Sequence, residues 1–347
     1  MLIGLWCGIV VLLCTSTSLA VQFIPLAPGR IAWDVSADGT TIVGDTINSG
    51  FRWTTDYGFE LVSGLVYATA VSSNGSRIGG GGGNDGNQPA IWTQNMGVQL
   101  IPGFTDSGAK SVRGISADGQ VAVGYSTGTH QSFRWDAVTG LELFSNAYFG
   151  NVNSANAITD DGKVSVGNDG DSAYQWTHES GLSSLGTTGF DSTAWGVSAD
   201  ASVIVGNFGQ QAFRWTQAGG MQGMGDLDGG GFKSAAWDIT PDGSIIVGDG
   251  TTDRGTEAFI WTQSSGMKSL MGLLTASGID LGGWQLRTAR GISDDGCVIV
   301  GSGLNPQGLT EAWVIIVPEP PTLFLALVAV KIIIGHRRRR SVSHNRV

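Results

Sequence analysis

The chain repeats one sequence unit seven times, and this repetition limits its possible folds more than any other feature. The unit reads small–x–x–Val/Ile–Ser/Thr–x–Asp–Gly–x–x–Ile/Val–Val–Gly, followed after a variable gap by aromatic or Ile–x–Trp–Thr and then Gly–apolar. A Trp in the second block marks each copy, at spacings of 39, 43, 41, 39, 46 and 52 residues: Trp53, Trp92, Trp135, Trp176, Trp215, Trp261 and Trp313. The copies fill residues 21–317, which we therefore interpret as one repeat domain.

Each unit predicts four short strands. Apolar residues alternate before the Asp-Gly step, which is a strong signal for a tight turn, and the Ile-Val-Gly that follows is a second strand. In the third, Phe213 and Trp215 share one face because side chains alternate with a period of two. A fourth run follows, such as residues 98–102 (VQLIP). Four antiparallel strands in ~41 residues are typical of a propeller blade, so we predict an all-β, seven-bladed β-propeller.

The two ends of the repeat region predict how the ring closes. The last unit has a third strand near residues 312–316 but no fourth, because Pro-Glu-Pro follows at once. The sequence at residues 21–25 (VQFIP) closely matches the fourth strand at residues 98–102. An open stack of blades would leave an apolar face uncovered at each end. We therefore expect the N-terminal strand to complete the last blade.

Composition and charge agree with this fold and exclude one class of partner. Gly makes up 55 of the 347 residues and charged residues only 14%, which suits short strands joined by tight turns. Six of the 19 Lys and Arg residues lie after residue 330, so residues 1–330 carry 13 basic against 29 acidic groups. A body this acidic repels phosphate backbones, and we expect no nucleic-acid partner.

The chain begins with a segment that we assign to export rather than to the fold. Leu2 to Leu13 is almost unbroken apolar sequence, and small residues at Ser18 and Ala20 suit cleavage by a signal peptidase. We predict a signal peptide over residues 1–20. Cys297 is then the one cysteine of the mature chain, so the expected core holds together without an internal disulfide.

The chain ends in three parts: Pro-Glu-Pro, an apolar run over residues 323–334, and an arginine cluster. The run is shorter than the ~20 residues of a membrane-spanning helix, and Lys331 interrupts it, so insertion requires Lys331 to snorkel toward the arginines. We expect a C-terminal hydrophobic helix within a sorting segment at residues 318–340, and a tail at 341–347. The alternative is a plain membrane-proximal stop sequence.

This ending resembles the PEP-CTERM sorting signal of bacterial envelope proteins. The resemblance implies export, membrane retention before processing by an exosortase-type transpeptidase, and association with exopolysaccharide at the cell envelope or surface. Its sorting-signal residues are Pro318, Glu319, Pro320, Arg337, Arg338, Arg339 and Arg340.

The repeats themselves resemble HAF-type extracellular repeats. Residues 225–231 (GDLDGGG), 235–239 (AAWDI), 246–248 (IVG) and 257–261 (EAFIW) carry the likeness. It implies secretion and a repeat architecture, without a particular activity.

The sequence shows no catalytic constellation. His130 and His178 belong to different units, and Ser116 recurs at a strand edge, outside any Gly-x-Ser-x-Gly elbow. The five glycines at 79–83 are followed by no Lys-Ser/Thr, so a phosphate loop is excluded. Turn chemistry accounts for the Asp of each Asp-Gly step: Asp38, Asp118, Asp161, Asp242 and Asp295. We predict no catalytic residues and no cofactor.

Two features leave room for a ligand. Oxygen ligands cluster at residues 226–229 (DLDG) and 168–171 (NDGD), which could hold Ca²⁺ but lack a distal bidentate carboxylate. Four tryptophans lie outside the marker series, where they fill gaps between blades or stack on a sugar ring: Trp33, Trp195, Trp237 and Trp284.

These observations favour an exported, envelope-associated, non-catalytic repeat protein that acts as a structural or interaction scaffold linked to exopolysaccharide. One alternative is a propeller enzyme that acts on polysaccharide in the central channel, as a glycoside hydrolase or lyase. The distinctive polar residues are interpreted as repeated or scattered, which argues against it. A second alternative is a calcium-dependent carbohydrate-binding module.

Overall fold

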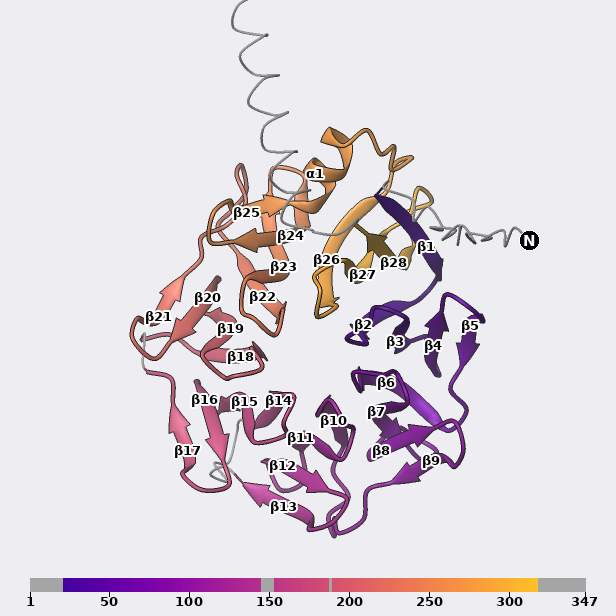
Figure 1. The fold of residues 1–347 in the computed structure, drawn as a ribbon, viewed down its shortest axis with the longest axis vertical. Helices are drawn as coiled ribbons and strands as arrows, with labels where there is room; N and C mark the ends of the chain where they lie inside the picture. Colours follow the sequence, from indigo (N-terminus) through magenta and orange to yellow (C-terminus); the bar gives the residue numbers. More distant parts are fainter. Residues whose placement is uncertain (1–20, 145–152, 187–188, 318–347) are drawn as a thin grey trace, which may run out of the picture.

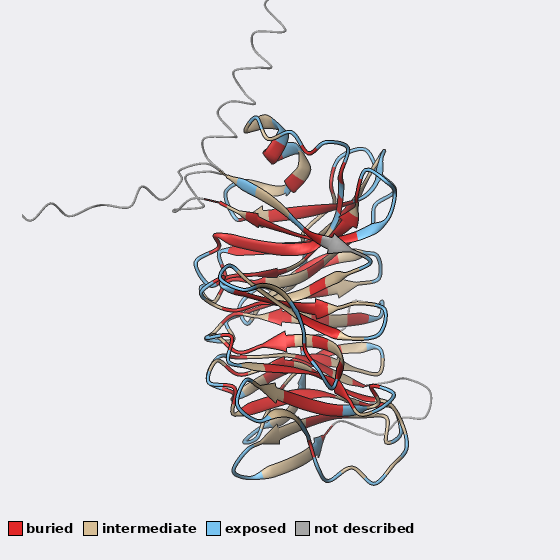
Figure 2. Cartoon of the chain, turned by 90° about the vertical axis from the view of Figure 1, so that its right-hand side faces the viewer, coloured by how far each residue is buried: buried red, intermediate tan, exposed pale blue. Residues whose placement is uncertain are grey.

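The computed structural model describes residues 21–144, 153–186 and 189–317. Within this range it forms seven four-stranded antiparallel sheets arranged in a ring around a central channel (Figure 1). Seen edge-on, the ring is a disc with buried residues inside the sheets and exposed residues in the loops at its two faces (Figure 2). The predicted all-β, seven-bladed propeller is confirmed.

Six blades are each built from four consecutive strands, with the first strand innermost. Blades 1 to 3 contain β2 (Ile31–Val35), β3 (Thr41–Asp45), β4 (Gly50–Thr54), β5 (Gly58–Leu61); β6 (Leu65–Val71), β7 (Arg77–Gly82), β8 (Gln88–Thr93), β9 (Gly97–Leu100); and β10 (Lys110–Ile115), β11 (Val121–Ser126), β12 (Gln131–Asp136), β13 (Gly140–Phe144). Blades 4 to 6 contain β14 (Ser154–Ile158), β15 (Val164–Asp169), β16 (Ser172–Thr177), β17 (Gly181–Ser184); β18 (Ser192–Val197), β19 (Val203–Phe208), β20 (Gln211–Thr216), β21 (Gly220–Gly223); and β22 (Ser234–Ile239), β23 (Ile245–Thr252), β24 (Gly255–Thr262), β25 (Gly266–Ser269).

Blade 7 joins the two ends of the repeat region. It contains β26 (Gln285–Ile292), β27 (Val298–Leu304), β28 (Thr310–Ile316) and, as its outer strand, β1 (Gln22–Pro28). β1 pairs antiparallel with β28, with Gln22 opposite Ile316 and Ile24 opposite Val314. The predicted closure by the N-terminal strand is therefore confirmed, and it covers the edge that β28 would otherwise expose.

Every innermost strand carries a β-bulge at the same point. In blade 6, Ala236 pairs with Gly248 and Asp238 with Val247, which leaves Trp237 as the extra residue. A Cβ on Gly248 would overlap the carbonyl oxygen of Ala235, so the repeated Gly provides the space for the bulge. The equivalent glycines of the other blades face the same register shift: Gly44, Gly80, Gly124, Gly167, Gly206 and Gly301. A bulge redirects the side chain of its extra residue, and here it does so beside the channel.

The repeated Asp residues stabilise the turn after each innermost strand, as predicted. In blade 1, the Ser36 hydroxyl donates to Asp38 Oδ1 at 2.6 Å and accepts from the Thr41 amide at 2.9 Å. Gly39, with φ of 70°, supplies the left-handed residue. In blade 3, the Gln120 amide and the Ser116 hydroxyl donate to Asp118, and these bonds hold its carboxyl pKa below the ordinary value.

One marker tryptophan occupies a different position from the other six. Trp53 lies opposite Ile42 and Trp261 opposite Ile246, two residues before the repeated Gly on the second strand. Trp313 instead lies opposite Gly301, where blades 1 and 6 place a Phe, and it is fully buried. The alignment of Trp313 with the marker series was therefore wrong by two residues, although its third strand was placed correctly.

A short helix lies in the longest spacing between markers. Helix α1 (Leu270–Ala276) begins after Ser269, whose hydroxyl accepts a hydrogen bond from the Gly272 amide. Figure 1 shows α1 at the outer edge of the ring, and its buried Leu273 and Leu274 join a core cluster that also contains Trp284. Sequence analysis did not predict this helix.

Candidate functional site

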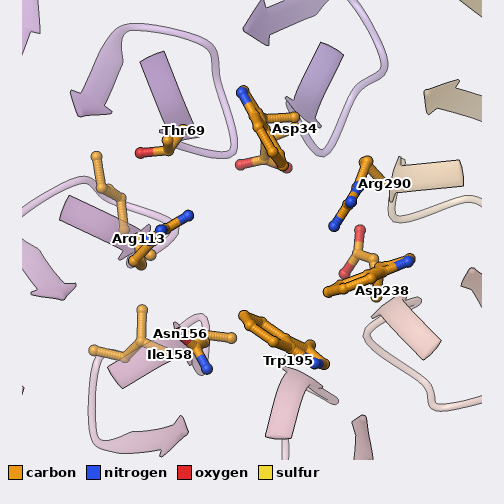
Figure 3. A pocket seen from close by; sticks show the side chains of 13 residues that line it. Asp34, Thr69, Arg113, Asn156, Ile158, Trp195, Asp238 and Arg290 are labelled. Atoms are coloured by element: carbon orange, nitrogen blue, oxygen red, sulfur yellow. The ribbon is translucent and has the colours of Figure 1, made fainter. Parts of the chain in front are cut away.

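The central channel is lined by the bulged residue of each of the seven blades, and we call these residues the channel ring. Each lies three positions before the repeated Ser or Thr of its unit. With Asp34 and Asp238 they surround a cavity of about 190 Å³ (Figure 3). The members of the channel ring are Trp33, Thr69, Arg113, Asn156, Trp195, Trp237 and Arg290.

Four members from consecutive blades form an aromatic and cationic arc. The ring centroids of Trp195 and Trp237 are 4.9 Å apart at an interplanar angle of 53°. The guanidinium carbon of Arg290 lies 3.8 Å from the Trp237 ring centroid and 5.0 Å from that of Trp33. Stacked cations and offset aromatic rings attract each other, so the arc is held together by its own members.

The three indole rings of the channel ring are also fixed from behind. Trp195 Nε1 donates to Asn207 Oδ1 at 2.7 Å. The indole nitrogens of Trp33 and Trp237 donate in the same way to Asp45 and Asp249. Each acceptor follows the repeated Gly on the second strand, so three blades use one arrangement to hold a Trp against the channel.

Two polar members of the channel ring bind the neighbouring blade. The Thr69 hydroxyl donates to the Val112 carbonyl at 2.6 Å, and Asn156 Nδ2 donates to the Ala194 carbonyl at 2.9 Å. Val112 and Ala194 occupy equivalent positions of blades 3 and 5, so these side chains link consecutive innermost strands.

The two arginines of the channel ring have no hydrogen-bond acceptor or ion-pair partner among the described residues. The Nε atoms of Arg113 and Arg290 are buried and unpaired. Figure 3 shows both side chains directed toward the channel from opposite sides. Burial lowers the pKa of Arg290 to about 10; the charge of Asp249 opposes this shift, and that of Arg113 adds to it.

Asp34 and Asp238 each follow the bulged residue of their strand, and each links its blade to the next blade along the channel wall. Asp34 accepts the amides of Val35 and Val71, each at 2.8 Å. Asp238 accepts the amides of Ile239 and Ile292, also at 2.8 Å. Burial raises the pKa of Asp34 to about 6, and it raises that of Asp238 to about 8, where the charge of Asp34 adds to the shift.

The opposite mouth of the channel is built from the turns after the innermost strands and from aspartate carboxylates. A second cavity of about 130 Å³ begins at the same two aspartates and ends at the turns after the innermost strands. Backbone hydrogen bonds connect adjacent turns there, for example from the Ala37 amide to the Ser73 carbonyl at 3.1 Å. The carboxylates of Asp160 and Asp294 also line this mouth, and burial raises the pKa of both. The indole and guanidinium groups lie in the channel ring, so we place the candidate site on the channel-ring side.

A side groove extends from the channel ring over blades 5 to 7. Its volume is about 440 Å³, and it shares Trp237 and Arg290 with the channel cavity. Lys233 and Arg287 line it further out, both exposed. Trp237 and Arg290 therefore line two adjacent cavities, which we call the channel site and the side groove.

The histidines and the calcium candidate noted in the sequence lie outside the channel site. His178 is exposed, with Nδ1 3.3 Å from Glu142 Oε2, and His130 precedes β12, so they lie in different blades and outside the channel site. The calcium candidate Asp226 accepts the amides of Leu227, Lys233 and Thr251 at 2.7–2.8 Å and the Thr251 hydroxyl at 2.6 Å. These bonds use its oxygens to join its own loop to the end of β23. Among the described residues, no three His, Cys, Asp or Glu side chains cluster as metal ligands would.

Two interpretations from sequence need correction. The distinctive polar residues are not scattered: Asp34, Arg113, Asp238 and Arg290 meet at one channel. Of the four tryptophans outside the marker series, Trp284 alone fills an inter-blade core, in edge contact with Phe23 at 5.2 Å. The other three belong to the channel ring.

The signal for the channel ring was present in the repeat. The position three residues before the Ser or Thr differs in type between units, while the residue before it is Ala or Val in all seven. A variable position inside an otherwise regular scaffold is typical of a ligand-facing residue. The bulge hid this, because a regular alternation does not predict which residue leaves the ladder.

Several predictions concern segments outside the described residues. The signal peptide at 1–20 and the sorting-signal residues of the segment 318–340, Pro318 to Pro320 and Arg337 to Arg340, all fall there. Within residues 21–144, 153–186 and 189–317, no helix has the length and apolar character needed to cross a bilayer.

No protein-family model matches the chain, and no curated protein matches it. Several solved structures resemble it. Virginiamycin B lyase from Staphylococcus aureus aligns over 86% of this chain and 99% of its own, with a TM-score of 0.57 and 13% identity. A streptogramin B lyase aligns over 85% and 97%, with a TM-score of 0.55 and 13% identity.

TolB from Acinetobacter baumannii aligns over 69% of this chain, which spans 62% of TolB, with a TM-score of 0.44 and 17% identity. For the two lyase structures, at 13% identity, the likeness shows a shared fold and no more. The chain is similar to β-propeller proteins in architecture.

Proposed function

We propose that this protein is an exported, non-catalytic scaffold of the bacterial cell envelope whose propeller binds a glycan at the channel site. The observation that carries the proposal is the channel ring, in which three indole rings are fixed by hydrogen bonds to Asp45, Asn207 and Asp249. Flat aromatic faces beside polar side chains suit a sugar ring, which has apolar faces and a hydroxylated rim.

The resemblance of the C-terminal segment to an envelope sorting signal supports the export and exopolysaccharide parts of the proposal. The channel cavity, about 190 Å³, is smaller than the ~300–1,000 Å³ of typical ligand pockets. It therefore suits a terminal sugar unit, with the rest of the chain lying in the side groove.

The test is a glycan array with the purified full-length chain, followed by calorimetry on the best ligand. Trp195→Ala should weaken binding by about tenfold or more, which corresponds to ~1.4 kcal/mol. Tyr57→Ala is the matched control, because Tyr57 is an exposed aromatic outside the channel. Unchanged affinity in the Trp195 variant would exclude the channel as the glycan site.

A second candidate is a polysaccharide-cleaving enzyme, and one observation favours it. Asp34 and Asp238 face the same channel with pKa values raised to about 6 and about 8. Two carboxyls with separated pKa values are typical of acid and base pairs. However, each carboxylate also accepts two backbone amides and joins two blades, which favours a structural role.

Product release distinguishes the two candidates. The array ligand should be recovered intact after prolonged incubation with the full-length chain. Shortened or unsaturated products that disappear in Asp238→Asn would favour the enzyme.

A further inference from the structure

The two channel-ring arginines are half-buried and lack the carboxylate partners that some other shielded cations of the described chain have. Lys110, which is buried, pairs with Asp106 at 2.8 Å, and the shielded Arg52 guanidinium pairs with Glu60 at 2.7 Å. Arg113 and Arg290 have no such pair within the described residues. Their guanidinium groups lie instead over the aromatic rings of Tyr125 and Trp237. Withdrawing a guanidinium group from water without a carboxylate partner is costly, and an anion in the channel would supply that partner.

We propose that the channel site and side groove bind an acidic glycan, an oligosaccharide that carries carboxylate or sulfate groups; this rests on the proposed glycan-binding function. The anion lies between Arg113 of blade 3 and Arg290 of blade 7, which reach into the channel from opposite sides (Figure 3). Guanidinium groups bind carboxylates and sulfates through two parallel hydrogen bonds, which a lysine ammonium does not provide.

Charge along the side groove supports a ligand with more than one acidic unit. Lys233, Arg287 and Arg290 line the groove. Its one carboxylate, Asp249, already accepts from Trp237 and from the Thr288 hydroxyl at 3.1 Å. The rest of the protein is acidic, so a local group of cations stands out against a repulsive surface.

The same features favour a sugar over a bare anion. An inorganic anion would use the arginines but not the three fixed indole rings. A glycan with acidic groups uses both, with the pyranose against Trp195 or Trp33 and the acid on Arg113 and Arg290. The side groove, about 440 Å³, then holds the following units.

The experiment uses calorimetry on the full-length chain with three probes of matched length: an oligogalacturonate, its fully methyl-esterified form and a sulfated neutral oligosaccharide. The acidic probes should bind at least about tenfold more tightly than the methyl ester, because a hydrogen bond to a charged group contributes ~1.5–3 kcal/mol. The ratio between the two acidic probes identifies carboxylate or sulfate as the recognised group.

Arg113→Gln and Arg290→Gln should each weaken acidic binding by about tenfold or more and leave the methyl ester unaffected. Lys268→Gln is the control, since Lys268 is an exposed cation on β25, away from the groove. Thermal melts establish that each variant is folded. If Arg290→Gln melts below the assay temperature, Arg290→Lys replaces it and should show an intermediate loss.

The outcomes separate this inference from the proposed function. Equal affinity for the acidic and esterified probes, or arginine variants that bind like the native chain, would overturn the acidic-glycan assignment while glycan binding stands. Failure of every neutral and acidic glycan to bind would remove both.

Discussion

The guanidinium of Arg290 stacks on the indole of Trp237 at 3.8 Å from the ring centroid, and the same indole donates its N–H to Asp249. One Trp thus positions a half-buried guanidinium group and holds a half-buried carboxylate. Burial raises the pKa of Asp249, and the Trp237 hydrogen bond and the Arg290 charge oppose that rise. The orientation of the arginine is consequently set before any ligand arrives.

Replacing Trp237 by Phe should separate these two roles. Phe keeps an aromatic face for Arg290 but removes the indole donor, which leaves Asp249 short of a partner. We expect a loss of about 1–3 kcal/mol in the free energy of unfolding, the usual cost of a buried group deprived of its hydrogen bond. Urea denaturation measures it. In a double-mutant cycle with Asp249→Ala, additive effects of the two changes would contradict the coupling.

Gly248→Ala should destabilise the fold because a Cβ there meets the Ala235 carbonyl oxygen and the Phe259 ring. We expect a loss of at least about 1–3 kcal/mol, typical of overpacking. Gly231→Ala is the matched control, since a Cβ on Gly231 meets no atom within 4 Å and its φ is not in the left-handed region. Equal thermal melting of both variants would show that the bulge does not require the glycine.

Stability should fall as pH rises from about 5 to about 8.5. In the native state the pKa of Asp238 is about 8, whereas the pKa of an Asp in the unfolded chain is about 4. Between these pH values Asp238 is protonated in the native state and ionised in the unfolded state. Across this interval the native state binds more protons, so the free energy of unfolding decreases with pH, by at most ~1.4 kcal/mol per unit for one group.

Asp238→Asn should flatten this pH dependence above about pH 7, where Asp34, with a pKa of about 6, has already lost its proton in the native state; the melting temperature across the range measures it. Asp118→Asn serves as control, because the pKa of Asp118 is lowered and its carboxylate stays ionised throughout. A slope that persists in the Asp238 variant would assign the pH effect to other groups.

Removing β1 should destabilise the ring as a whole. A chain that starts at Gly29 lacks the outer strand of blade 7, exposes the edge of β28 and loses the apolar contacts of Phe23, Ile24 and Leu26. Each such side chain contributes about 1.5–3 kcal/mol when fully buried. A chain that starts at Val21 is the control. Equal melting temperatures of the two chains would count against closure by the N-terminal strand.

Much of the fold could be predicted from sequence because the same turn and strand signals recur in each repeat. Asp-Gly turns, marker tryptophans and the likeness of residues 21–25 to 98–102 fixed the blades and their closure. The helix α1 escaped notice, since seven residues with apolar positions at Leu270, Leu273 and Leu274 are too few to separate from a loop.

The candidate site was harder to predict than the fold. Its residues come from seven units about 41 residues apart, and no local motif contains two of them except the pairs Trp33–Asp34 and Trp237–Asp238. Trp33, Trp195 and Trp237 were noticed as exceptions, but only the bulge shows that they share a register with Arg113 and Arg290.

The pairing of β1 with β28 also sets the order of events in folding. Gln22 can pair with Ile316 only after the ribosome has synthesised β28, so β1 stays unpaired while the strands between them are made. Contacts this distant in sequence slow folding. Before β1 pairs with β28 the ring is open, and the apolar faces at its two ends are exposed to water. The ring can therefore fold and unfold as one cooperative unit only when β28 is present. A chain truncated before blade 7 lacks the strand that closes the ring.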